Sequence, residues 1–554
     1  MYIKIFYTYR MERLPIIEKL ENKSSSFNFI NSEKTNPVFI FKLIIIFIFL
    51  ILGIRLFQLT VVKGSYFRRL SDENRLREYI IEPKRGEITD RNGEIIARTE
   101  LGNKDEKKER IESKRIYEIR EEIAHLVGYR QTADKNDHEN DNCLVKMKLG
   151  DKIGKKGIEK IYECDLRGKN GTKLVEVDAK GNYLKTFSIV QPEDGKTIQL
   201  AIDLKLQKKA YEIIKDKKAA VVALNPKTGE ILTFVSTPSF NPQVFEDKNQ
   251  TKIKEYFSDM DYPMFNRITD GTYPIGSIIK PFIAIGALED KKLDEKTIIE
   301  DTGSITAGQH TFGNWYFLDY GKTEGELNVV RAIKRSNDIF FYKTGERLGP
   351  SRIKFWANKF GFGEKTNLNF DQSEGLIPSP FWKEEVLQEQ WYLGDTYNMS
   401  IGQGYFLTTP IQVAQATSTI ANNGNLCQMN LLKEDKTKCK SLGIKMEYLN
   451  LIKEGMKQAC SAGGTGWPLF DFGIIDKNQS EATESAKIKK IQTACKTGTA
   501  ESADKKSEPH AWITVFAPFK NPEIVVTILV ENGGQGSDIA GPIAKEILKT
   551  YFEN

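Results

Sequence analysis

The sequence has little of what metal sites and disulfide scaffolds need. Its 554 residues include four histidines and six cysteines, and the cysteines form no CxxC pair and no zinc-site spacing with a histidine. A His-rich metal site and a disulfide-stapled fold are therefore not expected. Cys427 and Cys439 could pair across a loop, but we favour free thiols.

Strong charge of one sign is also missing. The formal net charge is +6 over 554 residues, and no basic stretch is interleaved with aromatic residues. This balance gives no reason to expect a nucleic-acid partner. The content of 40% hydrophobic and 28% charged residues is typical of a globular protein, and the length predicts two or three folded units.

One long hydrophobic run is present near the N-terminus. Leu43 to Ile54 carries no charge, and residues 38–62 have about the length that a helix needs to cross a membrane. A signal peptide is the alternative, but no small-residue cleavage site follows the run. We predict a transmembrane anchor over 38–62, a cytoplasmic tail over 1–37 and a long C-terminal body outside.

The rest of the chain predicts an α+β architecture. Residues 102–122 are dense in charge and predict a solvated helix. "AAVVALNPKTGEILTFVS" predicts two strands joined by the turn Asn225–Gly229, and "AWITVFAPFKNPEIVVTILVENGG" predicts two more near the C-terminus. Helical stretches lie between the two pairs. Strands at both ends of a domain imply one sheet that joins them.

The stretch "YPIGSIIKPF" places a serine and a lysine three residues apart. On a helix, Ser277 and Lys280 would lie on the same face. A serine hydroxyl becomes a nucleophile when a neighbouring base removes its proton, and a buried lysine can act as that base. S-x-x-K alone occurs by chance in many proteins, so on its own this motif favours an ordinary helix start over catalysis.

Two further motifs follow in a defined order. "KRSNDIFFY" contains Ser336 and Asp338, and "TACKTGTAES" contains the run Lys496–Thr499. A lysine, a hydroxyl and a glycine on a strand offer a cation, a hydrogen-bonding group and close backbone approach. The order S-x-x-K, S-x-N/D, K-T-G is typical of penicillin-binding proteins and β-lactamases.

The chain resembles the class B, monofunctional penicillin-binding proteins. "RGEITDRNGEIIA" is similar to the opening of their non-catalytic pedestal, and "WYLGDTYNMSIGQGYFLTTPIQVA" to the elongation-type branch, penicillin-binding protein 2. The resemblance implies a shortened, β-rich pedestal (dimerisation-type) domain over 63–200. It also implies an α+β transpeptidase domain over 201–554 with the penicillin-binding and serine β-lactamase fold.

The resemblance implies a role for each motif residue. Ser277 would attack the D-Ala–D-Ala amide of a stem peptide, with Lys280 as the base for acylation. Ser336 would relay a proton to the leaving amine, and Lys496 would keep the field positive. Asp338 stands where many relatives carry asparagine.

The K-T-G strand is implied in substrate binding. Thr497 and Thr499 would bind the terminal carboxylate of the substrate, and Gly498 would let the substrate backbone approach. The backbone N–H groups of Ser277 and Thr499 would form the oxyanion hole.

Two departures from the family pattern matter. Some relatives hold zinc with two aspartates, a histidine and a cysteine. This sequence keeps Asp301, but Asn314 and Asn337 replace two ligands and no histidine stands near Gly321. We therefore predict no metal and no cofactor, with His310 as a stray candidate. Only about thirty residues separate "DRNG" from "EIAHLVGY", so the head of the pedestal is expected to be reduced, which puts the usual scaffold partner in doubt.

The implied activity is serine-type D-Ala-D-Ala transpeptidation or carboxypeptidation during cell-wall elongation. The expected location is the bacterial inner membrane, with one span and the catalytic domain in the periplasm. Expected partners are stem peptides of the lipid-linked precursor, a polytopic glycan polymerase and β-lactams, but no nucleic acid. A penicillin-binding sensor or scaffold with little turnover is the alternative. A β-lactamase would need a deacylating base that the sequence does not identify.

Overall fold

The computed structural model describes residues 37–102, 110–178, 180–475, 488–502, 504 and 506–553. The chain divides into two compact units, with the boundary after Leu76.

The first unit is helical. It contains α1 (Pro37–Phe57), a π-helical turn (Gln58–Val62) and α2 (Gly64–Arg75). Pro37–Val62 has a mean hydropathy of 2.9, and none of its most apolar window is buried. The apolar run is thus a helix long enough to cross a membrane. Apart from Pro37, the predicted tail lies outside the described residues.

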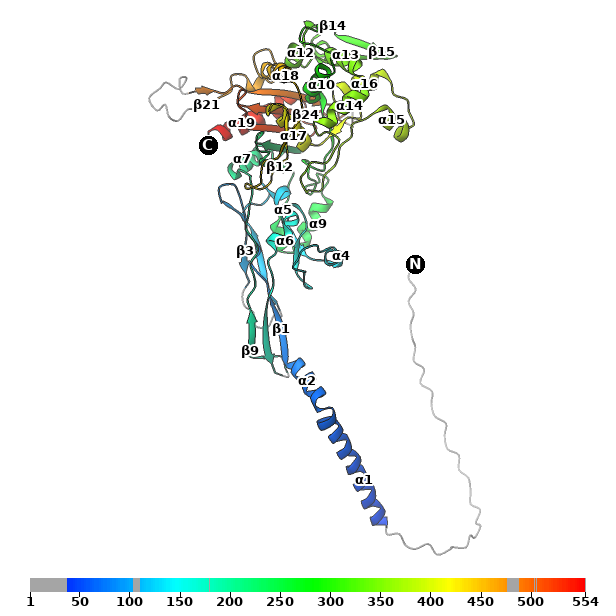
Figure 1. The fold of residues 1–554 in the computed structure, drawn as a ribbon, viewed down its shortest axis with the longest axis vertical. Helices are drawn as coiled ribbons and strands as arrows, with labels where there is room; N and C mark the ends of the chain where they lie inside the picture. Colours follow the sequence, from blue (N-terminus) through cyan, green and yellow to red (C-terminus); the bar gives the residue numbers. More distant parts are fainter. Residues whose placement is uncertain are drawn as a thin grey trace, which may run out of the picture. The chain divides into compact units, whose positions relative to one another are not determined.

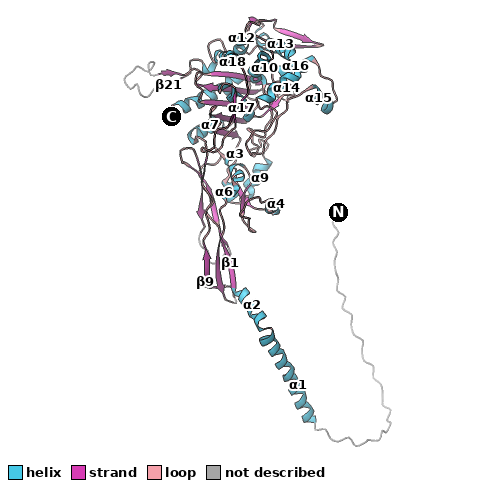
Figure 2. Ribbon diagram, viewed as in Figure 1, coloured by secondary structure: helices cyan, strands magenta, loops and turns pink. Residues whose placement is uncertain are grey.

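The second unit is built around a five-stranded antiparallel sheet (Figure 2). The strand order is β12-β11-β25-β24-β23. The strands are β11 (Ala219–Leu224), β12 (Ile231–Thr237), β23 (Ala494–Ala500), β24 (His510–Ala517) and β25 (Ile524–Val530). Since β11 pairs directly with β25, one sheet joins both ends of the domain, which confirms the predicted α+β fold.

Both faces of this sheet are buried, which explains why its strands β11 and β25 are almost wholly apolar. Ala219, Val221 and Ala223 of β11 pack in one core with α7 (Leu204–Ile214) and α19 (Gly541–Phe552). The alternate residues Ala220, Val222 and Leu224 pack in the larger core on the other face.

Helices fill that larger core (Figure 1). The central helix α10 is buried along almost all of its length, so its sequence KPFIAIGALE is apolar all round. The helical elements between the strand pairs are α8 (Gln243–Glu246), α9 (Gln250–Ser258), α10 (Lys280–Glu289), α11 (Trp315–Tyr320), α12 (Val329–Arg335), α13 (Asp338–Leu348), α14 (Pro350–Lys359), α15 (Pro380–Trp382), α16 (Leu393–Ser400), α17 (Pro410–Ala421) and α18 (Met446–Ala459).

Short two-stranded pairings lie among these helices. The pairs are β13 (Tyr273–Pro274) with β18 (Leu407–Thr408), β14 (Ile299–Asp301) with β17 (Gly325–Leu327), β15 (Ser304–Ala307) with β16 (His310–Gly313), β19 (Asn425–Cys427) with β20 (Cys439–Ser441), and β21 (Gly473–Ile475) with β22 (Ile488–Lys490).

The segment before β11 contains two four-stranded sheets, in the orders β4-β1-β8-β9 and β10-β2-β3-β5, and a two-stranded sheet. Its strands are β1 (Leu76–Ile81), β2 (Ile88–Thr89), β3 (Ile95–Leu101), β4 (Arg110–Ile111), β5 (Ser113–Tyr117), β6 (Arg130–Thr132), β7 (Lys152–Gly154), β8 (Gly171–Val177), β9 (Tyr183–Val190) and β10 (Ile198–Gln199). Four short helices, α3 (Ala124–Val127), α4 (Lys135–Glu139), α5 (Gly157–Ile161) and α6 (Glu163–Leu166), complete it.

A cluster of buried charges joins this segment to α8. Arg115 donates from Nε to Glu159 (2.8 Å), which also accepts from Arg85. Glu246 accepts from Nη2 of Arg130 (2.8 Å) and from the backbone N–H of Arg115 (3.1 Å). The two guanidinium groups hold the pKa of Glu159 at about 2, although burial alone would raise it.

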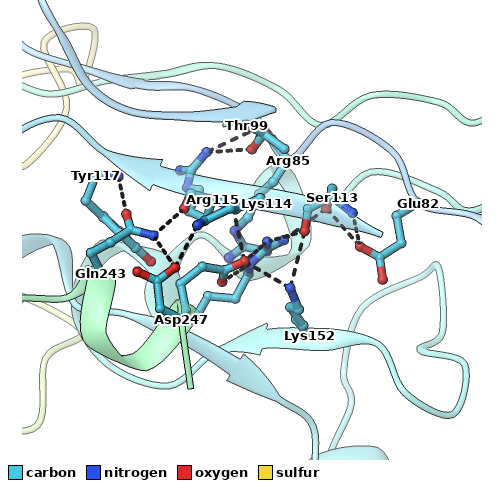
Figure 3. Close-up of polar contacts among 12 residues, drawn as sticks. Glu82, Arg85, Thr99, Ser113, Lys114, Arg115, Tyr117, Lys152, Gln243 and Asp247 are labelled. Atoms are coloured by element: carbon cyan, nitrogen blue, oxygen red, sulfur yellow. Dashed lines mark hydrogen bonds and ion pairs between the residues drawn. The ribbon is translucent and has the colours of Figure 1, made fainter. Parts of the chain in front are cut away.

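The predicted helix over 102–122 is wrong. Residues 103–109 lie outside the described residues, but Ser113–Tyr117 forms β5, and Arg115 is fully buried. Figure 3 shows the partners of this strand: Gln243, the first residue of α8, accepts from the backbone N–H of Tyr117 (3.0 Å), and Asp247, just after α8, forms an exposed ion pair with Lys114 (2.8 Å). The density of charge in 102–122 predicts a solvated surface, but alternate side chains of β5 are buried against partners from distant segments.

The cysteines correct a second prediction. All six form disulfides, Cys143–Cys164, Cys427–Cys439 and Cys460–Cys495, so the favoured free thiols are wrong. The pairing of Cys427 with Cys439, weighed as the alternative, follows from the register of β19 and β20, which places them opposite each other. The other two pairs join elements whose proximity is a product of the tertiary fold.

Candidate active site

The S-x-x-K motif forms the entry to the buried helix α10. Ser277 lies in a short 3-10 turn, Gly276–Ile279, and Lys280 is the first residue of α10. The backbone N–H of Lys280 donates to the carbonyl of Ser277. Ser277 is half-buried, whereas Lys280 is wholly buried. The sequence therefore sets a partly accessible hydroxyl one turn before a desolvated lysine.

Glycines allow this turn to approach its neighbours. The N–H of Gly276 donates to the carbonyl of Gly402 (2.8 Å). A Cβ on Gly402 would lie 2.3 Å from the carbonyl oxygen of Gly276, and one on Gly498 would lie 2.9 Å from Cγ1 of Ile278. The position of the serine thus depends on backbone packing that side chains at 402 and 498 would block.

Four of the predicted residues form one hydrogen-bonded cluster. Nζ of Lys280 donates to Oδ1 of Asp338 (2.7 Å) and to Oγ of Ser336 (3.4 Å). Nζ of Lys496 donates to the same Ser336 Oγ (2.8 Å). The hydroxyl of Ser336 therefore lies between the two lysines, with Ser277 one turn before Lys280.

Burial determines the charge state of the cluster. Loss of hydration lowers the pKa of Lys280, while the nearby carboxylate of Asp338 opposes that shift. The pKa of Lys496 falls well below its ordinary value, because it is fully buried and Lys280 is close. Two ammonium groups this close together and this deeply buried favour release of a proton, as a site for proton transfer requires.

The backbone at Ser336 presents its hydroxyl to both lysines. Ser336 ends α12 in the left-handed conformation (φ 55°), and α13 begins two residues later. Asn337 caps α13 by accepting a hydrogen bond from the N–H of Phe340 (2.9 Å). The S-N-D sequence thus ends one helix and starts the next.

The K-T-G stretch lies on β23, at one end of the sheet order. Lys496 is wholly buried, and Thr497 donates through Oγ1 to the hydroxyl of Thr465 (2.8 Å). Thr499 donates to the side chain of Gln535 (2.9 Å). Gln403 bridges to the same strand by donating to the carbonyl of Thr499 (3.3 Å) and accepting from the N–H of Glu501 (3.2 Å).

The positions that correspond to the zinc ligands of some relatives form a hydrogen-bonded chain. Oδ1 of Asn314 accepts from the N–H of Asp338 (3.0 Å), which leaves its NH2 group to donate to Asp301 (3.0 Å). An amide that points N–H groups at the carboxylate does not fit a metal there. The described residues contain no cluster of three or more His, Cys, Asp or Glu with the geometry to hold a metal, and the stray candidate His310 is exposed on β16.

The structure thus brings together Lys280, Ser336, Asp338 and Lys496, and packs Gly498 against the serine turn. Sequence reasoning missed Thr465 and Gln535, which contact the two threonines of β23. Neither belongs to a motif that the three main segments define, so only the fold reveals them.

Two family models match the chain. The penicillin binding protein transpeptidase domain matches residues 219–549, and the penicillin-binding protein dimerisation domain matches residues 108–200.

Curated and solved proteins are similar over most of the chain. The "Peptidoglycan D,D-transpeptidase MrdA" of Haemophilus influenzae is 34% identical over 465 residues, which cover 79% of this chain and 69% of that protein. A complex of penicillin-binding protein 2 and MreC from Helicobacter pylori has a TM-score of 0.72 at 28% identity, covering 86% of this chain and 99% of the solved one. Pseudomonas aeruginosa PBP2 in complex with WCK 5153 has a TM-score of 0.70 at 30% identity, covering 86% and 97%.

Proposed function

Because this chain belongs to the penicillin-binding proteins, in the class B elongation-type branch of peptidoglycan D,D-transpeptidases, we propose that it works through a covalent acyl-enzyme on Ser277. The observation that carries this proposal is the convergence of Lys280, Ser336, Asp338 and Lys496 beside the Ser277 turn. The remaining residues of the site support particular steps of the reaction.

Acylation begins when the hydroxyl of Ser277 attacks the D-Ala–D-Ala amide of a stem peptide. Lys280 accepts the serine proton in its neutral form, which burial favours by lowering its pKa. Ser336 passes a proton to the departing amine of D-Ala, since its hydroxyl contacts both lysines. The amide C–N bond breaks and an ester on Ser277 remains.

Deacylation completes the transfer. An amine of a neighbouring stem peptide attacks the ester, returns its proton through the lysine cluster and forms the cross-link. Water as acceptor would give carboxypeptidase activity instead. The backbone N–H groups of Ser277 and Thr499 stabilise the oxyanion, a contribution of about 3 kcal/mol for one donor. A β-lactam opens its ring on the same serine and stays bound.

The anchor and the cysteines support the location. A helix long enough to cross a membrane precedes the catalytic domain, and three disulfides are typical of an oxidising compartment. We place the chain in the bacterial inner membrane with its catalytic domain in the periplasm. A polytopic glycan polymerase would supply the strands that it cross-links, drawn from lipid-linked precursor.

Replacement of the serine tests the proposal. The Ser277→Ala variant should show no labelling by a fluorescent penicillin and no cross-linking of lipid-linked precursor in the presence of the glycan polymerase. Its thermal unfolding should stay close to wild type, because the site retains its packing. Labelling of Ser277→Ala, or wild-type protein that forms no cross-links with an active polymerase, would contradict the proposed function.

A further inference from the structure

A loop outside the three motifs joins them. Ser461–Gly466, sequence SAGGTG, follows α18, and we call it the 461–466 loop. It lies between the strand that carries Lys496 and the turn that carries Ser336, and its contacts reach both.

The loop is anchored at its start by a disulfide. Cys460, the residue before the loop, is bonded to Cys495, which lies two positions before Thr497 on β23. Both cysteines are buried, and a Cβ on Gly466 would lie 2.5 Å from Sγ of Cys495. The loop is therefore packed directly on the disulfide.

A second anchor comes from the S-x-D segment. Nη1 of Arg335 donates to the carbonyl of Gly463 (2.8 Å). Arg335 immediately precedes Ser336 and forms an ion pair with Glu324. The loop is thus tied to the neighbours of both Ser336 and Lys496.

These anchors place one hydroxyl against the K-T-G strand. Thr497 donates through Oγ1 to Oγ1 of Thr465 at 2.8 Å, and Thr497 itself is 8% exposed while Thr465 is half-buried. Each hydroxyl has one proton to donate, so when one of the pair donates to the other, the second keeps its proton free. In this pair Thr497 is the donor, so the hydroxyl of Thr465 keeps its own proton free to donate to an anion.

We propose that the free O–H of Thr465 donates to the terminal carboxylate of the substrate beside Thr497, and that the Cys460–Cys495 disulfide holds Thr465 in place. This inference rests on the proposed function and on the expectation, drawn from the family resemblance, that the K-T-G strand binds that carboxylate. Thr465 takes part in no covalent step. Its loss should weaken recognition of ligands that carry the carboxylate and leave the serine chemistry intact.

The test compares two ligands on the purified full chain in detergent. Benzylpenicillin carries the carboxylate, and its methyl ester does not. For Thr465→Val we expect the second-order rate constant of acylation by benzylpenicillin to fall about tenfold, as for loss of one charge-assisted hydrogen bond. The slower acylation by the ester should not change. Thr465→Ser, which keeps the hydroxyl, should restore the benzylpenicillin rate.

The disulfide is tested with a matched control. The double variant Cys460→Ala/Cys495→Ala should lose benzylpenicillin acylation selectively, in the same sense as Thr465→Val. The control Cys427→Ala/Cys439→Ala removes a disulfide from the β19–β20 hairpin and should change the two ligands alike. If the Cys460/Cys495 variant loses acylation by benzylpenicillin and by the methyl ester to the same extent, the ratio of the two rates stays at the wild-type value. That result would overturn the role of the disulfide.

The remaining outcomes separate this inference from the proposed function. Equal losses for both ligands in Thr465→Val, unchanged rates for both, or no restoration by Thr465→Ser would each overturn the role of Thr465. Those results leave the proposed function standing as long as Ser277→Ala abolishes labelling. Labelling of Ser277→Ala would instead defeat the proposed function itself.

Discussion

Asp338 gives the site a charge where many relatives have a neutral amide. Its carboxylate accepts from Lys280 (2.7 Å) and from the backbone N–H of Trp315 (3.0 Å). The backbone N–H of Asp338 donates to Oδ1 of Asn314, so hydrogen bonds hold both the main chain and the carboxylate of this residue in position. An opposite charge at this distance keeps a proton on the lysine and competes with the effect of burial.

The Asp338→Asn variant tests this balance. Asparagine can still accept a hydrogen bond from Lys280, but it removes the charge that raises the pKa of the lysine. We expect the pKa of Lys280 to fall further, so that the acid limb of the pH profile for acylation moves to lower pH. The measurement is the rate of labelling by fluorescent penicillin from pH 5 to pH 9. A shift toward higher pH would contradict the assignment of Lys280 as the base.

The motifs predicted the residues of the cluster but not its supports. Ser277, Lys280, Ser336, Asp338 and Lys496 stand out because three short patterns occur in a fixed order. Thr465 does not, because its role depends on a disulfide and on the turn that brings the loop back to β23. Such contacts come from tertiary packing and leave no periodic trace in the sequence.

At the level of elements, the serine turn depends on close backbone packing. Gly402 has a φ of 72°, and a Cβ there would overlap the carbonyl of Gly276. Gly321 has a similar φ of 66°, but a Cβ there would meet no atom within 4 Å. An alanine at either position would therefore suffer similar backbone strain, but only an alanine at 402 would also clash with a neighbouring atom.

We expect Gly402→Ala to slow acylation by more than tenfold and to lower the melting temperature, since the Gly276–Ile279 turn must move. Gly321→Ala should cost about 1 kcal/mol of stability from the left-handed conformation alone, with acylation unchanged. Labelling kinetics and thermal unfolding measure the two effects. Equal acylation rates in Gly402→Ala and Gly321→Ala would show that the Gly276–Ile279 turn can move without loss of acylation.

The buried carboxylate Glu159 predicts acid sensitivity of the segment before β11. Its pKa is about 2 in the folded chain and near 4.5 when unfolded, so its ionised form stabilises the fold fully above pH 4.5. That stabilisation, about 3 kcal/mol, is lost as the pH falls from 4.5 through 2. Glu159→Gln should flatten this dependence and destabilise the fold at pH 7 by about 3–5 kcal/mol.

Chemical denaturation at several pH values measures both effects. Glu193→Gln is the control, because its ion pair with Lys169 is exposed and should contribute less than about 1 kcal/mol. If the free energy of unfolding of Glu159→Gln depends on pH as it does in wild type, other carboxylates account for the acid sensitivity.

The strands with continuous apolar runs were predicted correctly from the sequence, whereas the charged strand β5 was not. The strand pairs around Asn225–Gly229 and near the C-terminus appear as β11 with β12 and β24 with β25, because two buried faces require continuous apolar runs. Arg115 of β5 is charged, yet it is buried, since its side chain pairs with Glu159 and its backbone N–H donates to Glu246. Charge density alone does not separate a solvated face from a paired interior.

On the scale of the whole molecule, the apolar helix α1 predicts how the protein behaves in solution. A chain that begins at Lys63 lacks the Pro37–Val62 span but keeps every element of the second unit. We expect it to remain in the aqueous phase of a detergent partition, whereas the full chain enters the detergent phase. Labelling by fluorescent penicillin should survive the truncation, since the site lies in the second unit. Recovery of the truncated chain in the detergent phase would point to a second membrane-binding surface.

The sheet order has a consequence for how the protein is made. Strand β11 precedes the serine turn in the chain, while its neighbour β25 and the lysine-bearing β23 follow near the end. A ribosome therefore completes the nucleophile long before it supplies the second cation. Under the proposed function, a nascent chain has neither the complete sheet nor Lys496 beside Ser277, so the serine is expected to be chemically silent. Acylation by β-lactams and by substrate would then begin together, once translation has delivered the final strands.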